Sequence, residues 1–326
     1  MNAKYSIQKL SSDESTLLIE ENLSSNPLAL PTQNGHYKLE IHQDIDDSSL
    51  SGKISHSLLF TINYPPTFSI LNEYIEPGDL LILEGRHLDQ NKHYQIKVDL
   101  YHDGSGFIPY EDRFIAFVPV TSKSNPGEYL LTINDPENTE IFELAFQIQE
   151  KEFPIQQLTT SSSTASIQND NNYALMEEAF ERGRANLHEE PLWDGPFLQP
   201  AEGRISTEYG VIRFTNGSES SSRHSGIDFA NPLGTPTYAT QNGYITLSEM
   251  INVTGNTVFI DHGFQIISQY YHLETMAVEV GDYVKKGDLI GTIGSTGFST
   301  GPHLHFSIYS HGVYVNPWKF FEKAPF

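Results

Sequence analysis

Two histidines stand two residues apart in the stretch GPHLHFSI, residues 301–308. Alternate side chains of a β-strand point to the same face, so His303 and His305 would share one face with Ser307. The apolar residues between them would fill the opposite face as core. A histidine pair at the wall of a sheet points to metal binding or proton transfer.

A second pair of this kind is His224 and Asp228 in the stretch RHSGIDFA. Gly226 and the serine-rich flank argue against a helix there, but residues i and i+4 share a face in an extended chain as well. Either geometry brings the imidazole and the carboxylate together. With one histidine of HLH they form a set of two histidines and one aspartate, which suits zinc with one position open to water.

The chain has no cysteine, so His, Asp and Glu are its only strong metal ligands. A zinc ion with three protein ligands polarises a carbonyl and lowers the pKa of its bound water toward ~7. Hydrolysis also needs a proton acceptor near that water. His272 in YYHLE and the remaining histidine of HLH are the candidates, because the motif HExxH is absent from the sequence.

The last part of the chain has the pattern of a compact antiparallel β domain. From residue 191 onward, short β runs such as NGYITL, NTVFIDHG and QIISQYYHL alternate with glycine turns. The first 62 residues carry similar short runs and predict a small β domain. Residues 63–158 have strands at regular spacing with Pro-Gly and Asp-Gly turns, which favours an immunoglobulin-like β-sandwich.

Residues 159–190 predict a linker with one helix. The polar stretch 159–171 is typical of a flexible connector. After it, Leu175, Met176, Ala179 and Phe180 recur at helical spacing, with Asn171 or Asn172 as the N-cap. The predicted fold class is therefore mainly β, with one helix between the N-terminal and C-terminal domains.

Charge and hydropathy exclude some classes of partner. The formal net charge is −23, and residues 191–326 contain only 7 of the 19 basic and 12 of the 42 acidic residues. The acidity thus belongs to the front half, and we expect no nucleic-acid partner because clusters of Lys and Arg are missing. No apolar run reaches the ~18 residues of a membrane helix, and the first residues do not read as a signal peptide. The sequence leaves the oligomeric state open.

Five segments in a fixed order carry a family resemblance: RHSGIDFA, NTVFIDHG, QYYHLE, GSTGFSTGPHLHF and VNPWKFF. Together they resemble the lysostaphin-type (LytM-like) zinc endopeptidases, which cleave the peptide part of bacterial peptidoglycan. The resemblance extends over residues 197–322. It implies a peptidoglycan peptide substrate and an extracellular or cell-wall location.

Carried over position by position, the resemblance makes His224, Asp228 and His305 the zinc ligands. It makes His272 and His303 the pair that activates the water and stabilises the oxyanion. All five positions are filled, which favours an active enzyme. The alternative is a non-catalytic binding or activator module with the same fold. A carrier domain, indicated by VGDYVKKGDLIGTIG, lacks the sequence around a modified lysine and leaves His224 and Asp228 unexplained.

The resemblance does not identify which tyrosine would stabilise the oxyanion. Relatives often place an aromatic hydroxyl ahead of the first ligand, where Phe214 has none, so Tyr209, Tyr270 and Tyr271 remain candidates. We expect the groove walls to be residues 213–223 and 294–301.

We expect three further polar residues in this region to have structural rather than catalytic positions. We interpret His262 and Asn256 as turn residues and His311 as an exposed hairpin residue.

Overall fold

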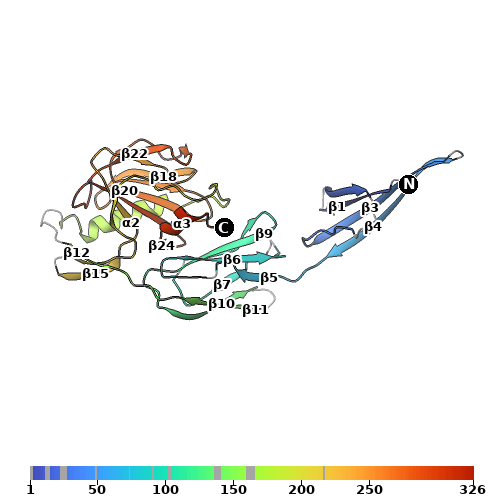
Figure 1. Cartoon of the computed structure of the whole chain (residues 1–326), viewed down its shortest axis with the longest axis horizontal. Helices are drawn as coiled ribbons and strands as arrows, with labels where there is room; N and C mark the ends of the chain where they lie inside the picture. The colour runs from blue at the N-terminus through green and yellow to red at the C-terminus, as the bar shows by residue number, and fades with distance from the viewer. Residues whose placement is uncertain are drawn as a thin grey trace. The chain divides into compact units, whose positions relative to one another are not determined.

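The computed structural model describes residues 3–11, 15–22, 28–47, 50–72, 74–89, 92–101, 105–135, 141–158, 166–215 and 217–326 (Figure 1). The chain is mainly β and divides into two compact units. The first unit comprises Met1–Thr67, Gly85–Asn91 and Glu111–Arg113. The second comprises Phe68–Glu84, Lys92–Tyr110 and Phe114–Phe326. Within the described ranges, no helix is long and apolar enough to cross a membrane.

The first unit contains one antiparallel sheet in the order β2-β1-β3-β4. Its strands are β1 (Ala3–Leu10), β2 (Ser15–Asn22), β3 (Gly35–Asp47) and β4 (Leu50–Ile62). Tyr5, Ile7 and Tyr37 are buried on one face, because alternate residues of each strand point the same way. The ring of Tyr37 stacks on Phe60 at 5.6 Å.

Two further sheets follow. A four-stranded sheet has the order β5-β6-β9-β8, and a three-stranded antiparallel sheet has the order β11-β10-β7. Their strands are β5 (Thr67–Ile70), β6 (Leu80–Arg86), β7 (Gln95–Lys97), β8 (Ile108–Tyr110), β9 (Arg113–Pro119), β10 (Gly127–Asn134) and β11 (Ile141–Ile148). Phe68 of β5 contacts Phe142 of β11 at 4.7 Å between ring centroids, so side chains of the two sheets pack together.

The C-terminal domain is built on a ten-stranded sheet in the order β13-β16-β23-β20-β19-β18-β21, with β17, β22 and β24 paired off this path. Its strands are β13 (Arg204–Thr207), β16 (Ile227–Ala230), β17 (Pro236–Tyr238), β18 (Gly243–Ile251), β19 (Gly255–Asp261), β20 (Ile267–Met276), β21 (Tyr283–Val284), β22 (Leu289–Ile293), β23 (His303–Ser310) and β24 (Val313–Val315). All of its pairings are antiparallel. The central strand β23 buries Leu304, Phe306 and Ile308 completely, as the alternation of HLHFSI predicts.

A fifth sheet, of three strands, connects the middle of the chain to this domain. Strand β12 (Ile155–Leu158) pairs in parallel with β14 (Ile212–Thr215), which pairs antiparallel with β15 (Ser218–Arg223). Because β12 directly follows the middle sheets, those sheets and the C-terminal domain are joined by backbone pairing as well as by the chain.

Helix α2 (Asp170–Gly183) corresponds to the predicted helix, with two corrections. Its N-cap is Asn169, whose side chain accepts from the Asn172 amide at 3.0 Å, rather than Asn171 or Asn172. Leu175 is exposed, and the docked face consists of Met176, Ala179 and Phe180. Of the predicted connector, residues 159–165 lie outside the described residues.

Close packing fixes the end of this helix on the sheet. A Cβ added at Gly183 would lie 2.8 Å from the Phe259 ring, so only glycine allows the helix to approach β19 this closely. A second, short helix, α3 (Trp318–Glu322), was not predicted.

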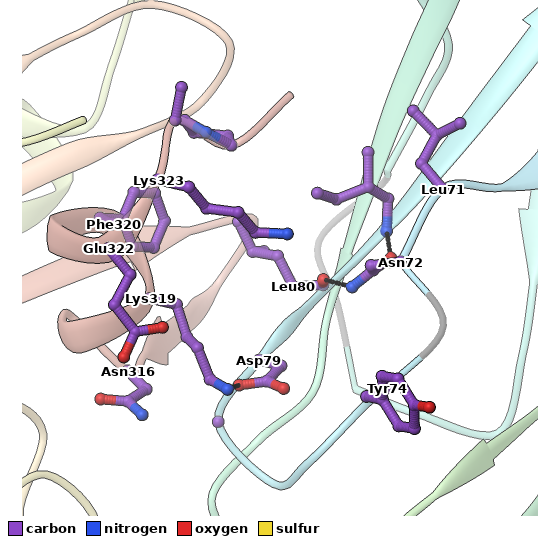
Figure 2. A pocket seen from close by; sticks show the side chains of 14 residues that line it. Leu71, Asn72, Tyr74, Asp79, Leu80, Asn316, Lys319, Phe320, Glu322 and Lys323 are labelled. Atoms are coloured by element: carbon purple, nitrogen blue, oxygen red, sulfur yellow. Dashed lines mark hydrogen bonds and ion pairs between the residues drawn. The ribbon is translucent and has the colours of Figure 1, made fainter. Parts of the chain in front are cut away.

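The middle sheets and the C-terminal domain share one core inside the second unit. The buried Phe264 ring contacts Tyr110 and Phe117 at 6.3 and 5.7 Å. A pocket of about 350 Å³ lies between them, and Lys319 Nζ of α3 is 3.8 Å from Oδ1 of the buried Asp79. Figure 2 shows the Lys319 side chain pointing toward Asp79. Burial raises the pKa of Asp79. The C-terminal domain therefore rests on the middle sheets through both apolar and polar contacts.

Candidate metal centre

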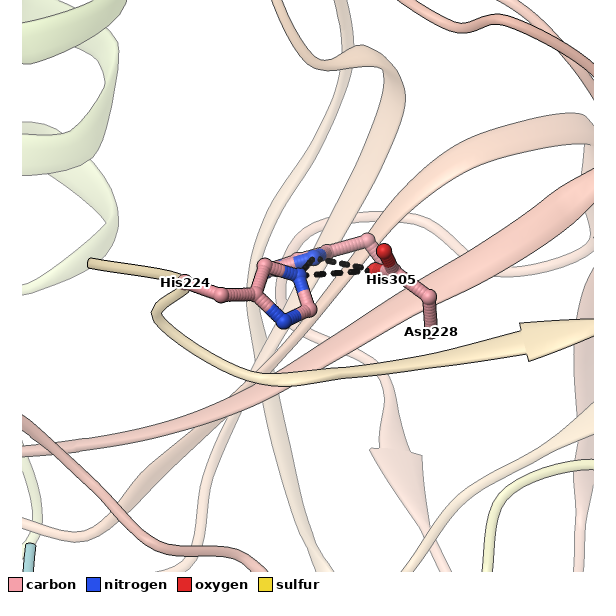
Figure 3. A group of neighbouring side chains, drawn as sticks. All are labelled: His224, Asp228 and His305. Atoms are coloured by element: carbon pink, nitrogen blue, oxygen red, sulfur yellow. Dashed lines mark hydrogen bonds and ion pairs between the residues drawn. The ribbon is translucent and has the colours of Figure 1, made fainter. Parts of the chain in front are cut away.

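His224, Asp228 and His305 converge at one buried point (Figure 3). His224 follows β15, and Asp228 on β16 lies directly opposite His305 on β23 in the antiparallel register. His224 Nε2 lies 2.9 Å from Asp228 Oδ1 and 2.9 Å from His305 Nδ1, and His305 Nδ1 lies 2.8 Å from Asp228 Oδ1. The turn between His224 and Asp228 needs Gly226, because a Cβ there would lie 2.0 Å from the Phe306 carbonyl oxygen.

The donor set fits a divalent cation that accepts nitrogen and oxygen ligands. His224 Nδ1 lies 2.8 Å from the Glu208 carbonyl oxygen, which can only accept, so Nδ1 carries a proton and Nε2 is the ring nitrogen that faces Asp228 and His305. Burial alone would raise the pKa of Asp228, but the neighbouring His224 and His305 outweigh it and hold this pKa well below its ordinary value. Burial lowers the pKa of His305 to about 4 despite Asp228. Neutral imidazoles and an ionised carboxylate are the metal-binding forms.

The second oxygen of Asp228 is held from outside the cluster. Arg213 Nη2 donates to Asp228 Oδ2 at 2.9 Å, and Arg213 Nε donates to Gln156 Oε1 at 3.2 Å. Gln156 Nε2 in turn donates to the Thr207 hydroxyl at 3.2 Å. This chain of contacts was not predicted, because nothing in the sequence around Gln156 connects it to a residue 57 positions later.

His272 and His303 lie beside the cluster, with ring centroids 4.8 Å apart. The Nδ1 atom of His272 donates to the Thr296 carbonyl and that of His303 donates to the Gly301 carbonyl, both at 2.8 Å. In both rings Nε2 is therefore the nitrogen that remains for other contacts. Burial, reinforced by His303 and His305, lowers the pKa of His272 to about 3, so this ring is neutral near pH 7.

The backbone of His272 has a left-handed conformation with φ of 62°. For a residue with a Cβ, such a conformation costs about 1–3 kcal/mol of conformational free energy. The pairing of β20 with β22 shifts register between Leu273 and Thr275, directly after His272. The irregular strand thus turns the imidazole toward the cluster, which a regular strand would not do.

The sequence of residues 222–317 matches Peptidase family M23. The C-terminal domain belongs to this family. This confirms the family predicted from the motifs.

Relatives of the M23 domain include the peptidoglycan DD-endopeptidase ShyA of Vibrio cholerae, which is 34% identical over 43% of this chain and 36% of the relative. The chain spans about a third of the length of the curated relatives that it matches. The crystallised catalytic domain of lysostaphin from Staphylococcus simulans is 34% identical, aligned over 37% of this chain and 92% of that domain, with a TM-score of 0.34.

The crystal structure of a Pseudomonas aeruginosa protein assigned to peptidase M23 has a TM-score of 0.51 and 25% identity. The alignment covers 77% of this chain and 96% of that one. The likeness in fold therefore extends beyond the M23 domain.

A groove of about 530 Å³ opens over the histidines of the M23 domain. The expected loop 294–301 contributes Phe298, Ser299, Thr300 and Gly301 to it. The other expected wall, residues 213–223, contributes Arg213 and Arg223 to the lining of the groove. Helix α2 adds Tyr173, Met176 and Phe180, a wall that the sequence did not predict.

The candidate tyrosines have different surroundings. Tyr209 and Tyr270 are buried and bonded elsewhere, to the Tyr314 carbonyl and the Thr240 amide. Tyr271 lines the groove and stacks on His305 at 5.0 Å, with an interplanar angle of 11°. Tyr314 also lines the groove and was not among the predicted tyrosines.

The remaining candidates have structural contacts. His262 lies in the turn after β19, completely buried, with Nδ1 on the Asn242 carbonyl and Nε2 2.8 Å from the Ser268 hydroxyl. Asn256 binds the Leu273 carbonyl at 3.0 Å. The prediction of an exposed His311 was wrong: this hairpin residue is buried, with its ring against Phe117 of the middle sheets at 6.5 Å.

Proposed function

We propose that this chain is a zinc-dependent endopeptidase that hydrolyses peptide bonds of bacterial peptidoglycan, in a stem peptide or a cross-bridge. The observation that carries the proposal is the convergence of His224, Asp228 and His305 beside two further histidines inside an M23 domain. The name of the Vibrio cholerae relative, a peptidoglycan DD-endopeptidase, supports the substrate class.

We assign the metal to His224 Nε2, Asp228 Oδ1 and His305 Nδ1, whose atoms lie within 4.8 Å of one another. When bound, zinc supplies Lewis-acid activation of a water molecule and of the scissile carbonyl. The protein orients its ligands through the Glu208 carbonyl behind His224 and through Arg213 behind Asp228. Such contacts keep the ligand atoms in place and the imidazoles in the correct tautomer.

We assign proton transfer and oxyanion stabilisation to His272 and His303. Their free Nε2 atoms accept a proton from the attacking water, and once protonated they donate to the developing oxyanion or the leaving amine. The two carbonyls behind their Nδ1 atoms, on Thr296 and Gly301, fix both rings for this role.

The groove walls favour an extended peptide with small side chains. Ser299, Thr300 and Gly301 on one side leave room close to His303. Selectivity of a hydrolase comes from such walls rather than from the metal. A peptidoglycan substrate places the enzyme outside the cell or in the wall, and we propose this location.

We also propose the domain organisation predicted from the sequence: a small β domain at 1–62, an immunoglobulin-like sandwich at 63–158, a linker and helix at 159–190, and the peptidase domain at 191–326. The support for the sandwich is its two sheets of four and three strands, joined by the contact of Phe68 with Phe142.

Digestion of purified sacculi tests the function. The zinc-loaded full-length chain is incubated with sacculi of several cross-link types, and the released muropeptides are identified by mass. New amino termini that disappear with a chelator and return with zinc support an endopeptidase. If a zinc-loaded, folded chain releases nothing from any sacculus, the domain is a binding module. Release of sugars without peptide cleavage would contradict the mechanism.

A further inference from the structure

Few charged side chains line the groove. Among the described residues around it, the only Asp, Glu, Lys or Arg side chains are Arg213, Arg223 and Asp228. The chain as a whole has a formal charge of −23. The groove is therefore a locally basic hollow in an acidic protein, even before a metal adds its own charge.

The two arginines differ in what compensates their charge. Arg213 is paired with Asp228, 2.9 Å from its Oδ2. Arg223 instead donates from Nη1 to the Ser122 carbonyl at 2.5 Å, and its guanidinium lies 4.7 Å from the centroid of the Phe153 ring. Within the described residues these partners are neutral. Among the described residues no carboxylate pairs with Arg223, which therefore adds a positive charge to the groove.

The position of Arg223 fits a role in substrate binding. It is the last residue of β15 and directly precedes His224, so its backbone is fixed beside the metal cluster. Ser122 and Phe153 hold the guanidinium from the side of the middle sheets. A guanidinium has five N–H donors in a planar fork that matches a carboxylate, and the Ser122 carbonyl occupies only one of its nitrogens.

We propose that Arg223 binds a free carboxylate of the peptide substrate close to the bond that is cleaved. The groove then selects peptides whose carboxyl group is ionised over the same peptides in carboxamide form. This inference rests on the proposed endopeptidase function and names what the same groove selects. Replacing a carboxylate by a carboxamide removes the charge from the hydrogen bond, which corresponds to about 10- to 100-fold in kcat/KM.

Matched peptides test the inference. Cross-linked peptidoglycan peptides are prepared with each free carboxyl group either ionisable or converted to carboxamide, and kcat/KM is measured with the zinc-loaded full-length chain. The wild type is expected to prefer one carboxylate position by at least about 10-fold. In Arg223→Gln this ratio should fall to near one, with the loss mainly in KM, whereas Arg223→Lys should retain part of it.

The control is Arg204→Gln, which removes an exposed arginine of β13 that does not line the groove. It should keep the full preference, and the zinc content of every variant is measured alongside. If Arg223→Gln does not fold, the test rests on Arg223→Lys, whose preference for the carboxylate peptide should be lower than that of the wild type.

Cleavage of both peptide forms at equal rates by the wild type overturns the inference and leaves the endopeptidase function standing. An unchanged preference in Arg223→Gln or Arg223→Lys overturns it as well. Cleavage of neither form overturns the proposed function, and the inference with it.

Discussion

At the scale of single residues, three of the four histidines of the site share one hydrogen-bonding pattern, and the four divide into two classes by their distance from Asp228. His224, His272 and His303 each donate Nδ1–H to a backbone carbonyl, which leaves Nε2 as the ring nitrogen for other contacts. The Nε2 atom of His224 lies 2.9 Å from Asp228 Oδ1, whereas that of His303 lies 3.9 Å from the same oxygen. This difference agrees with the roles that we propose, in which His224 is a metal ligand and His303 exchanges a proton.

Substitution of the two classes should give different losses. His305→Ala is expected to abolish tight zinc binding, because it removes one of three ligands. His272→Ala should retain about one zinc per chain and lose ~10²- to 10⁴-fold in rate, the usual contribution of a general acid or base. Metal analysis after reconstitution, with kcat on a peptide substrate, checks both. Zinc retained by His305→Ala, or lost equally from His272→Ala, would mean that the roles are interchanged.

His262 predicts a pH dependence of stability. Complete burial lowers the pKa of His262 from 6.5 to about 4, although the Asn242 carbonyl and Asp261 oppose this. Between these two pH values the unfolded chain binds a proton that the folded chain does not. The free energy of unfolding therefore falls as the pH is lowered through this window, by up to about 3 kcal/mol.

Denaturation at a series of pH values between 4 and 7, followed by tryptophan fluorescence in the metal-free protein, measures this effect. Both tryptophans, Trp193 and Trp318, lie in the second unit. His262→Gln should flatten the pH profile relative to the wild type, and His93→Gln, which changes an exposed histidine of the same unit, should not. Parallel profiles for all three proteins would contradict the prediction.

At the scale of elements, strand β12 acts as a support for the metal cluster. It pairs in parallel with β14, which places Gln156 opposite Arg213. The carboxamide of Gln156 then accepts from Arg213 Nε and donates to Thr207 on β13. Residues of three strands therefore position the Arg213 guanidinium, which donates to Asp228. A strand from the middle of the chain thereby orients Asp228, the metal ligand that we propose in the C-terminal domain.

Gln156→Ala should weaken zinc binding by roughly 10-fold, the low end of the range for residues that orient metal ligands. Competition with a chelating dye measures the affinity. The control is Gln157→Ala, because Gln157 is the exposed neighbour on the same strand and points the other way. Equal zinc affinity of the two variants would show that Arg213 needs no help from β12.

The local patterns predicted which residues meet, but not what supports them. The alternation of HLHFSI placed His305 opposite the core residues correctly, since a strand repeats every two residues. Asn169 was missed as the cap because three further asparagines or aspartates lie within the next three positions, and each would serve as well. His311 was predicted as exposed because a hairpin tip gives no sign of the Phe117 ring against it.

At the scale of the whole molecule, contacts between distant segments are the ones that the sequence does not show. Gln156 and Tyr173 reach the groove from outside residues 191–326, where the peptidase domain was predicted. Neither residue stands in a motif. A polar residue on an edge strand is usually a surface residue, and an aromatic residue on a helix is usually a core residue, so neither indicates a functional site. Their role depends on tertiary packing alone.

Two fragments of the chain should therefore differ in stability. Residues 64–326 contain the middle sheets, whereas residues 166–326 lack Phe117 and Tyr110, which pack on the buried Phe264. The shorter fragment should lose at least about 2 kcal/mol of unfolding free energy, since burial of a phenylalanine contributes ~1.5–3 kcal/mol. Thermal unfolding followed by Trp193, which contacts Phe264 at 6.0 Å, measures this. Equal melting temperatures would contradict the shared core.

The parallel pairing of β12 with β14 also has a consequence for the order of folding. Ile155 meets Ile212 only after a long loop closes, and His305 meets Asp228 across a separation of 77 residues. Hairpins such as β18 with β19 need no such closure and can form early. We therefore expect the three residues of the cluster to meet later than the residues of such hairpins, so that a folding chain gains its ligand geometry only after local β structure has formed.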